Sequence, residues 1–301
     1  METRVVLLLL AALLCAGLLP WAATADSKPV FCIKSDLYKG PIRCNKTVDE
    51  IFTVDQFEAM FNHRNEPQAH AQGFWDYTSF IDAAKTFQEQ GFAVTGGDDL
   101  QKRELAAFFA HVAHETTCGY SAAKDGPYAW GLCYKEELSP PKLYCVRSLL
   151  YPCALGASYH GRGAMPLYWN DNYGISGQAL KYDLIHNPDL VANNATVAFQ
   201  TAILRWMSPV KLNQPSAHDV MVNKWKPTKN DTDSFRFPGF GMTINILNGD
   251  LECGHGTDPR MEDRIAHYQY FLRILAPDAD EGQNLDCGLQ AILNLPTDAR
   301  M

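Results

Sequence analysis

Residues Glu104 to Glu137 read ELAAFFAHVAHETTCGYSAAKDGPYAWGLCYKEE, an apolar helical pattern that runs into one carboxylate and is followed by a second acidic cluster. Apolar side chains recur at three- and four-residue spacing, which predicts an amphipathic helix with Glu115 in its last turn. Asp98 and Gln101 have the spacing of a capping box at its start. The apolar stripe consists of Leu105, Phe108, Phe109, Val112 and Ala113.

Glu115 and Glu137 form a candidate pair of general acid and general base. The negative end of the helix dipole and the apolar neighbours both disfavour the anion, so we expect a raised pKa for Glu115, as a general acid requires. Glu137 ends the charged run Lys135-Glu136-Glu137, where we expect a solvated, ionised carboxylate suited to a general base. Two glutamates alone are more often surface residues, which is the alternative interpretation.

Other segments of the chain also carry helical patterns. Thr53 with Gln56 forms a second capping-box pattern, and Asp258 before Pro259 predicts the start of a last helix. Alternating strand patterns are scarce, so we expect a mainly α domain with small β elements. The remaining apolar stripes are Phe57, Met60 and Phe61; Phe80, Ala83, Ala84 and Phe87; Phe199, Ala202, Ile203 and Trp206; and Met261, Ile265, Tyr268, Leu272 and Leu275.

Several blocks, in order along the chain, resemble the plant-type family 19 glycoside hydrolases, the chitinases. HETTCG resembles the family's HETTGG, and DGPYAWGLC resembles DGPYAWGYC, with Glu137 at the position of the family's second glutamate. Further blocks are YHGRGAMPLYWNDNYG (159–174), NPDLVANNATVAFQTAI (187–203) and PGFGMTINILNGDLECGHG (238–256). The resemblance runs from about Phe52 to about Cys287 and implies a bilobal, lysozyme-like fold with a central cleft.

The resemblance also implies an activity, the endo-hydrolysis of β-1,4-linked N-acetylglucosamine polymers with inversion. Glu115 would protonate the leaving oxygen while Glu137 activates a water, which requires the two carboxyls to lie roughly 6.5 to 9.5 Å apart. This chemistry requires no cofactor. A metal site is not predicted either, because HETTC has a cysteine where the HExxH zinc motif has its second histidine.

Further site residues follow from the same resemblance. Asn172 and Asn248 match asparagines that hydrogen-bond the sugar and help to position water. Glu252 and Arg264 match a charged pair that supports the base. Two aromatic residues are predicted either to stack on sugar rings or to lie in the core, with equal weight: Trp130 and Tyr173.

Three residues depart from the family pattern inside the expected site. Pro166 replaces a glutamine that contacts substrate, Tyr168 replaces a serine that holds the attacking water, and Asp171 replaces a tyrosine. These changes resemble the plant chitinase-like branch of the family, which is linked to cellulose assembly and cell-wall organisation. Two hypotheses therefore stand: a chitinase-type hydrolase, and a catalytically weak or inactive protein that binds glucan or chitin-like chains. Lysozyme activity is a third, weaker alternative.

Residues 1–25 have the features of a signal peptide, with Arg4, the apolar run VVLLLLAALLCAGLL and the small-residue sequence Ala23-Thr24-Ala25. We expect an N-terminal extension over 26–50, the catalytic domain over 51–290 and a C-terminal tail over 291–301. The expected location is extracellular, in the cell wall or apoplast, as a monomer without a stable membrane anchor. A net charge of −8 without a basic stripe argues against nucleic-acid binding and suits a polysaccharide partner, either chitin oligomers or cell-wall glucan.

The cysteines and sequons agree with secretion. Nine cysteines become an even number once Cys15 leaves with the signal peptide, and disulfides are expected in an oxidising compartment. The resemblance implies Cys145–Cys153 and Cys253–Cys287. Because Cys118 replaces a family glycine and the usual N-terminal partner of Cys133 is missing, we predict Cys118–Cys133 and Cys32–Cys44; the alternative joins Cys32 or Cys44 to Cys133. Sequons predict glycosylation at Asn45, Asn194 and Asn230.

Overall fold

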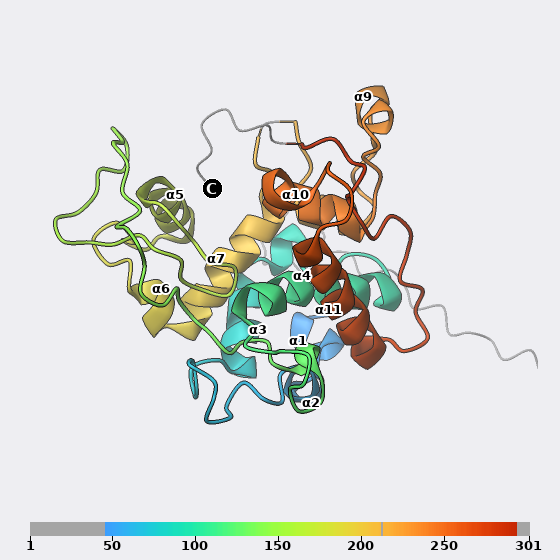
Figure 1. The fold of residues 1–301 in the computed structure, drawn as a ribbon, viewed down its shortest axis with the longest axis horizontal. Coiled ribbons are helices and arrows are strands. Elements are labelled where there is room, and N and C mark those ends of the chain that lie inside the picture. The colour runs from blue at the N-terminus through green and yellow to red at the C-terminus, as the bar shows by residue number, and fades with distance from the viewer. Residues whose placement is uncertain (1–45, 212, 294–301) are drawn as a thin grey trace, which may run out of the picture.

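The computed structural model describes residues 46–211 and 213–293, and it is helical as predicted (Figure 1). Within these residues the only β pairing consists of two isolated bridges, Glu136 with Arg162 and Arg162 with Leu167. The helices are α1 (Val48–Ile51), α2 (Val54–Met60), α3 (Tyr77–Thr86), α4 (Asp98–Thr116), α5 (Asn170–Leu180), α6 (Leu190–Asn193), α7 (Ala195–Met207), α8 (Ala217–Met221), α9 (Lys229–Asp233), α10 (Phe240–Glu252) and α11 (Pro259–Leu275), with 3-10 turns η1 (Gln88–Gln90) and η2 (Pro127–Ala129).

Helix α4 is the central element of the fold. Its residues from Glu104 to Ala113 are all buried, because α11, α8 and α1 pack around it. A helix that is covered on all sides must be apolar nearly all round, and its run of alanines and phenylalanines meets that requirement. The helix ends at Thr116, so Glu115 lies in the last turn, as predicted.

The predicted capping box at the start of α4 is wrong. The N-cap residue is Gly97, and no side chain caps the helix. The Gln101 side chain is buried instead, and its amide donates to the carbonyls of Val94 at 3.3 Å and Gly96 at 2.8 Å. Gln101 therefore ties α4 to the preceding loop, a contact that the local spacing did not indicate.

The other predicted helix starts are confirmed. The Gln56 side chain accepts from the Thr53 backbone at 3.0 Å, which completes the capping box of α2. Asp258 caps α11 by accepting from Arg260 and Met261. The stripes on α2, α3, α7 and α11 form a continuous aromatic core against α4, in which Phe80 and Phe109 have ring centroids 4.7 Å apart.

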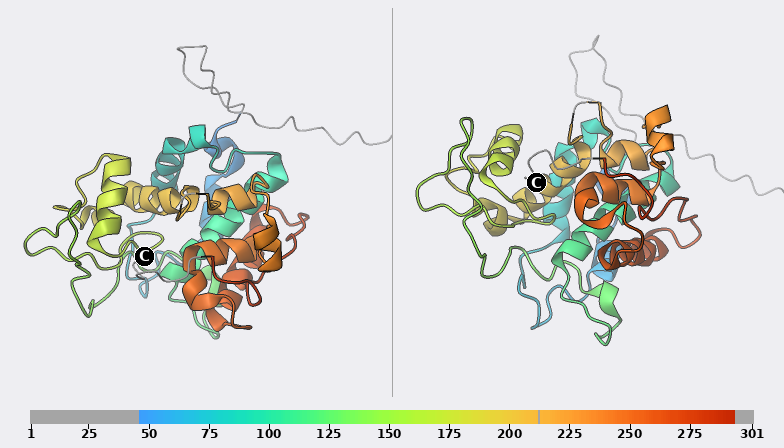
Figure 2. Two further views of the ribbon diagram at one scale, coloured as in Figure 1. Left: turned by 90° about the horizontal axis from the view of Figure 1, so that it is seen from above. Right: turned by 45° about the horizontal axis from the view of Figure 1, so that its top comes forward.

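Helix α5 and the long loops before it lie to one side of the body formed by α4, α10 and α11, and Figures 1 and 2 show this separation from three directions. Helix α7 runs between the two parts and packs on α5, α6 and α3. This arrangement gives two lobes joined through α7. The side chains of interest lie where α4, α7, α10 and the loop before α5 approach one another.

Three disulfides join the pairs that the sequence analysis expected: Cys118–Cys133, Cys145–Cys153 and Cys253–Cys287. The first of them excludes a bond from Cys133 to the N-terminal cysteines. Cys32, Cys44, the sequon at Asn45 and the signal peptide lie outside the described residues. Asn194 and Asn230 are exposed, so both remain predicted glycosylation sites.

Among the helices that the structure describes, none combines the length and apolar character needed to span a bilayer.

Candidate active site

Glu115 lies at the C-terminal end of α4 with 26% of its side chain exposed. Its Oε1 atom accepts from Nη2 of Arg264 at 2.5 Å and from the side-chain amide of Asn248 at 3.2 Å. Arg264 belongs to α11 and Asn248 to α10, where Asn248 interrupts the helical backbone with φ −145°. This kink turns the asparagine amide toward the carboxylate, so three helices meet at Glu115.

The predicted rise in the pKa of Glu115 is wrong. Burial raises the pKa, but the charge of Arg264 and, less strongly, those of His114 and Arg205 outweigh it and lower the pKa to about 2. Burial is the largest single effect and acts in the expected direction, but the nearby positive charges and the hydrogen bond from Arg264 together reverse it. Without a ligand, Glu115 is an anion.

Arg264 is held by a fully hydrogen-bonded buried network. Its guanidinium donates to both carboxylate oxygens of Glu252 at 2.8 and 2.9 Å and to Nδ1 of His111 at 3.2 Å. Burial and Arg264 keep the pKa of His111 well below its usual value. An arginine cannot accept a hydrogen bond, so His111 is neutral with its proton on Nε2, which donates to Thr243 Oγ1 at 2.9 Å.

The Glu252–Arg264 pair thus contacts the predicted acid. We expected this pair to support the base, Glu137, and that expectation is corrected, because Arg264 donates to Glu115. On the other side of Glu115, the neighbouring His114 pairs through Nδ1 with Asp263 at 2.6 Å.

Glu137 is half-buried on the loop that follows the Cys118–Cys133 disulfide. Its backbone N–H donates to Gly161 at 2.7 Å, which fixes the two loop segments side by side. Its Oε1 atom accepts from the Tyr144 hydroxyl at 2.8 Å, and burial together with this contact raises the pKa of Tyr144 to about 12. The carboxylate is therefore partly enclosed and not freely solvated as we had expected.

Tyr144 is a site residue that the sequence analysis missed. It adopts a positive φ of 49°, as does Trp169 with φ 72°, and the two rings pack 5.3 Å apart. Non-glycine residues in this region are strained, and such strain clusters at functional sites. The position of Tyr144 directly before the disulfide-bonded Cys145 was the one available signal.

Tyr168 lines a cavity beside the site and packs on Tyr144, the residue that bonds Glu137. Burial, which is the largest cause, and the negative charges of Glu137 and Glu115 all raise the pKa of Tyr168. The ring rests on the backbone of Gly161, where a Cβ atom would come within 2.3 Å of Tyr168 Cζ. Only glycine allows this approach. Tyr168 also packs on Tyr144 at 5.1 Å, so two phenols cover the Glu137 side of the site.

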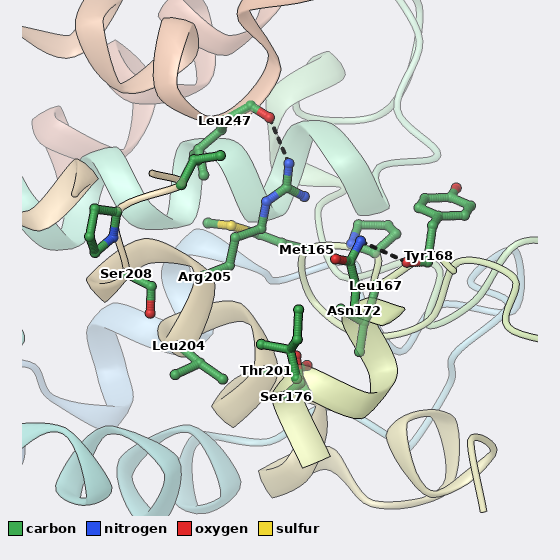
Figure 3. A pocket seen from close by; sticks show the side chains of 14 residues that line it. Met165, Leu167, Tyr168, Asn172, Ser176, Thr201, Leu204, Arg205, Ser208 and Leu247 are labelled. Atoms are coloured by element: carbon green, nitrogen blue, oxygen red, sulfur yellow. Dashed lines mark hydrogen bonds between the residues drawn. The ribbon is translucent and has the colours of Figure 1, made fainter. Parts of the chain in front are cut away.

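A cavity of about 310 Å³ opens beside Tyr168, between α5, α7 and the end of α10 (Figure 3). Pro166 lines it, and Asn172 reaches from α5 to donate to the Tyr168 carbonyl at 2.9 Å. Arg205 extends from α7 and donates to the Leu247 carbonyl at 2.6 Å. Most of the lining is apolar: Met165, Pro166, Leu167, Ile175, Leu204, Pro209, Val210 and Leu247. Asp171 is partly exposed on α5 and does not line this cavity.

The structure separates the two aromatic residues that were proposed to stack on sugar. Tyr173 is fully buried, and its hydroxyl donates to His160 at 2.7 Å while Arg162 donates to it at 3.0 Å. A role in binding sugar is therefore excluded for Tyr173, which belongs to the core. Trp130 is also mostly buried and stacks on His63 at 4.4 Å, although it borders a second cavity of about 290 Å³ beside Tyr120.

The histidines of the AHVAHETTC segment (110–118) act as hydrogen-bonding groups within the protein. His111 bonds Thr243 and Arg264, and His114 bonds Asp263. Across residues 46–211 and 213–293, no cluster of three or more histidine, cysteine or acidic side chains has the arrangement of a metal site.

Comparison with known proteins matches this architecture. The family model described as chitinase class I, glycoside hydrolase family 19, fits residues 51–287. Chitinase-like protein 1 of Arabidopsis thaliana is 52% identical over 84% of this chain and 81% of its own length. Inactive chitinase-like protein 1 of Hevea brasiliensis is 49% identical over 79% of this chain and 74% of its own.

Relatives named as enzymes are nearly as similar. An endochitinase of Brassica napus is 48% identical over 79% of this chain and 72% of its own. The crystal structure of chitinase C from Streptomyces griseus superposes with a TM-score of 0.62 at 33% identity, covering 81% of this chain and 99% of that one. The helical, lysozyme-like fold is thereby confirmed, and the chain belongs to glycoside hydrolase family 19, the chitinases.

Proposed function

We propose that this chain is a secreted cell-wall protein that binds β-1,4-linked N-acetylglucosamine polymers in this cleft and hydrolyses them slowly by inversion. Glu115 is the general acid and Glu137 the general base in this proposal. The observation that carries it is the cavity beside Tyr168, whose wall leads to both carboxylates. Arg205 on that wall contacts Asn248, which donates to Glu115, and Tyr168 packs on Tyr144, which donates to Glu137. An inverting mechanism requires such a space, in which sugar and water fit between acid and base.

The neighbouring groups support these roles. The Asn248 amide donates to Glu115 and, with substrate bound, could donate to a sugar oxygen instead. Asn172 lines the adjoining cavity. The predominantly apolar lining of that cavity suits the C–H faces of pyranose rings and the methyl of an N-acetyl group. We further propose that Glu252 and Arg264 hold Glu115 in position for the reaction.

Slow turnover follows from the electrostatics of the acid. With a pKa of about 2, Glu115 is protonated in only about one molecule in a thousand at pH 5. The base is hindered as well, because the Tyr144 hydroxyl occupies one oxygen of Glu137 and the Tyr168 ring packs on Tyr144. Each effect lowers the population of the reactive arrangement without removing either carboxylate.

The test is hydrolysis and binding of a soluble N-acetylglucosamine hexamer by the purified secreted chain. We expect measurable binding by calorimetry and a low rate that disappears in Glu115→Gln and in Glu137→Gln. The matched control is Glu136→Gln, which removes the adjacent carboxylate and should leave the rate within about twofold. Equal rates in the wild type and both site variants would refute the assignment of acid and base.

A second candidate function is polysaccharide binding without hydrolysis, in cell-wall or cellulose assembly. The two tyrosines on the Glu137 side favour it, since together they can take the volume of the attacking water. Hydrolysis by the unsubstituted chain separates the candidates, because the second predicts hexamer binding with no product at all. The double variant Pro166→Gln with Tyr168→Ser then tests the cause, and it should gain rate by about tenfold or more if water regains its position. No gain would show that these two residues are not what limits hydrolysis.

A further inference from the structure

The three most exposed large apolar side chains in the described part of the chain lie on one loop. Leu149, Leu150 and Leu155 are 93%, 81% and 106% exposed. They belong to residues 142–155, KLYCVRSLLYPCAL, which we call the leucine loop. In Figures 1 and 2 this yellow-green segment projects from the edge of the molecule, on the side opposite α10 and α11. The catalytic arrangement does not use these leucines.

The leucine loop is tied to the protein by a disulfide and by hydrogen bonds. The Cys145–Cys153 disulfide closes it. The fully buried Asn170 holds it from inside, accepting from the Val146 N–H at 2.8 Å and donating to the carbonyls of Val146 at 3.0 Å and Tyr151 at 2.8 Å. These bonds lie on both sides of Leu149 and Leu150 and restrain the backbone that carries them. Such restraint lowers the ordering cost of docking.

The charge of this region differs from that of the molecule as a whole. The chain carries a net charge of −8, yet residues 138–170 contain no aspartate or glutamate. The leucine loop itself contributes two exposed cations, Lys142 and Arg147. This segment is therefore positive in a chain that is negative as a whole, and an anionic surface would attract it.

Protruding leucines flanked by cations fit one kind of partner best. Side chains that stand almost fully free in solvent need a medium that closes around them, and the interface of a lipid bilayer does so without matching pockets. Lysine and arginine beside them gain from anionic headgroups. A flat polysaccharide surface would instead call for exposed aromatic rings.

We propose that the leucine loop is a membrane-contact site, which inserts Leu149, Leu150 and Leu155 reversibly into the interface of a bilayer that contains anionic lipid. The contact is peripheral and needs no spanning helix. The three leucines lie outside the cavity beside Tyr168, while Tyr144 of the same loop donates to Glu137, so the tests change the leucines and leave Tyr144 in place.

The test is flotation of the purified secreted chain with phosphatidylcholine vesicles that contain no anionic lipid or one fifth phosphatidylserine. We expect binding to the anionic vesicles that weakens in high salt. The double variant Leu149→Ser with Leu150→Ser should lower the partition coefficient by at least about tenfold, because fully burying one leucine is already worth that factor. Arg147→Gln should lower it about fivefold.

The matched control is Leu289→Ser, which removes a leucine that is 76% exposed elsewhere on the surface and should bind as the wild type does. Unchanged thermal unfolding will show that the variants are folded. Absence of binding to anionic vesicles, or equal binding by the double leucine variant, would overturn the proposal. Sedimentation of a dimer that the same variant dissociates, without vesicle binding, would assign the loop to self-association instead.

Discussion

Replacing Glu115 by glutamine should remove a contribution to folding stability that is present at neutral pH and is lost in acid. The carboxylate has a pKa of about 2 in the folded protein and about 4.5 without its partners. Because the folded value is the lower one, the contribution of Glu115 is fully present above pH 4.5 and is lost as the pH falls toward 2. Glutamine keeps an oxygen that can accept from Arg264, but it has no proton to gain.

The magnitude follows from the two pKa values. A drop from 4.5 to about 2 corresponds to about 3 kcal/mol of stability at neutral pH. At pH 3 the unfolded chain is largely protonated at this position while the folded chain is not, so about 2 kcal/mol of that stability is already lost. The pH range from 6 to 3 therefore contains most of the effect.

Urea unfolding at pH 6 and pH 3 measures this pH-dependent contribution of Glu115 directly. The stability difference between the wild type and Glu115→Gln should shrink by about 2 kcal/mol at the lower pH. The control Glu89→Gln, at an exposed glutamate, should show no such change. A difference that stays constant would mean that Glu115 titrates normally in the folded protein. A difference that grows at pH 3 would mean that its pKa is raised, as the local sequence suggested, and would refute our account of Arg264.

Three further predictions concern the buried groups. His111→Leu should cost about 3 kcal/mol in urea unfolding, because it leaves an Arg264 donor unpaired, whereas His111→Gln should cost less, since its amide can replace both ring nitrogens. His218 pairs with the fully buried Glu104 at 2.6 Å, and its pKa is raised, so its stabilising effect is complete below pH 6.5 and is lost as the pH rises through the folded value. His218→Gln should therefore cost about 3 kcal/mol at pH 5.5 and less at pH 9 in the same assay. Tyr173→Phe should lower stability by about 1 to 2 kcal/mol and leave the hexamer affinity in calorimetry unchanged, because its hydroxyl bonds only within the core.

Features with local causes could be predicted from the sequence. The apolar periodicity of α4 and α7, the capping box at Thr53 and the Asp258–Pro259 helix start depend on residues within a few positions of each other. The Cys118–Cys133 bond could also be predicted, because Cys118 replaces a family glycine and the usual N-terminal partner of Cys133 is missing. The capping box at Asp98 failed since Gln101 is engaged by the preceding loop.

The electrostatics of the site could not be predicted from local sequence. Arg264 lies on α11, far along the chain from Glu115, and its direct contact reverses the effect of the helix dipole and burial. Tyr144 was missed for the same reason, because only the folded loops bring its hydroxyl to Glu137. Tyr173 was instead predicted as a possible sugar-binding ring but lies in the core. Its hydroxyl accepts a hydrogen bond from Arg162 and donates one to the His160 carbonyl.

The most direct test of the central claim is to follow the N-acetylglucosamine hexamer with the wild-type chain by proton NMR and to record the anomeric form of the first products. Slow release of the α-anomer from the β-linked substrate, absent in Glu115→Gln, is the predicted result. Initial release of the β-anomer, or stable binding without any product, would contradict inverting hydrolysis by Glu115 and Glu137.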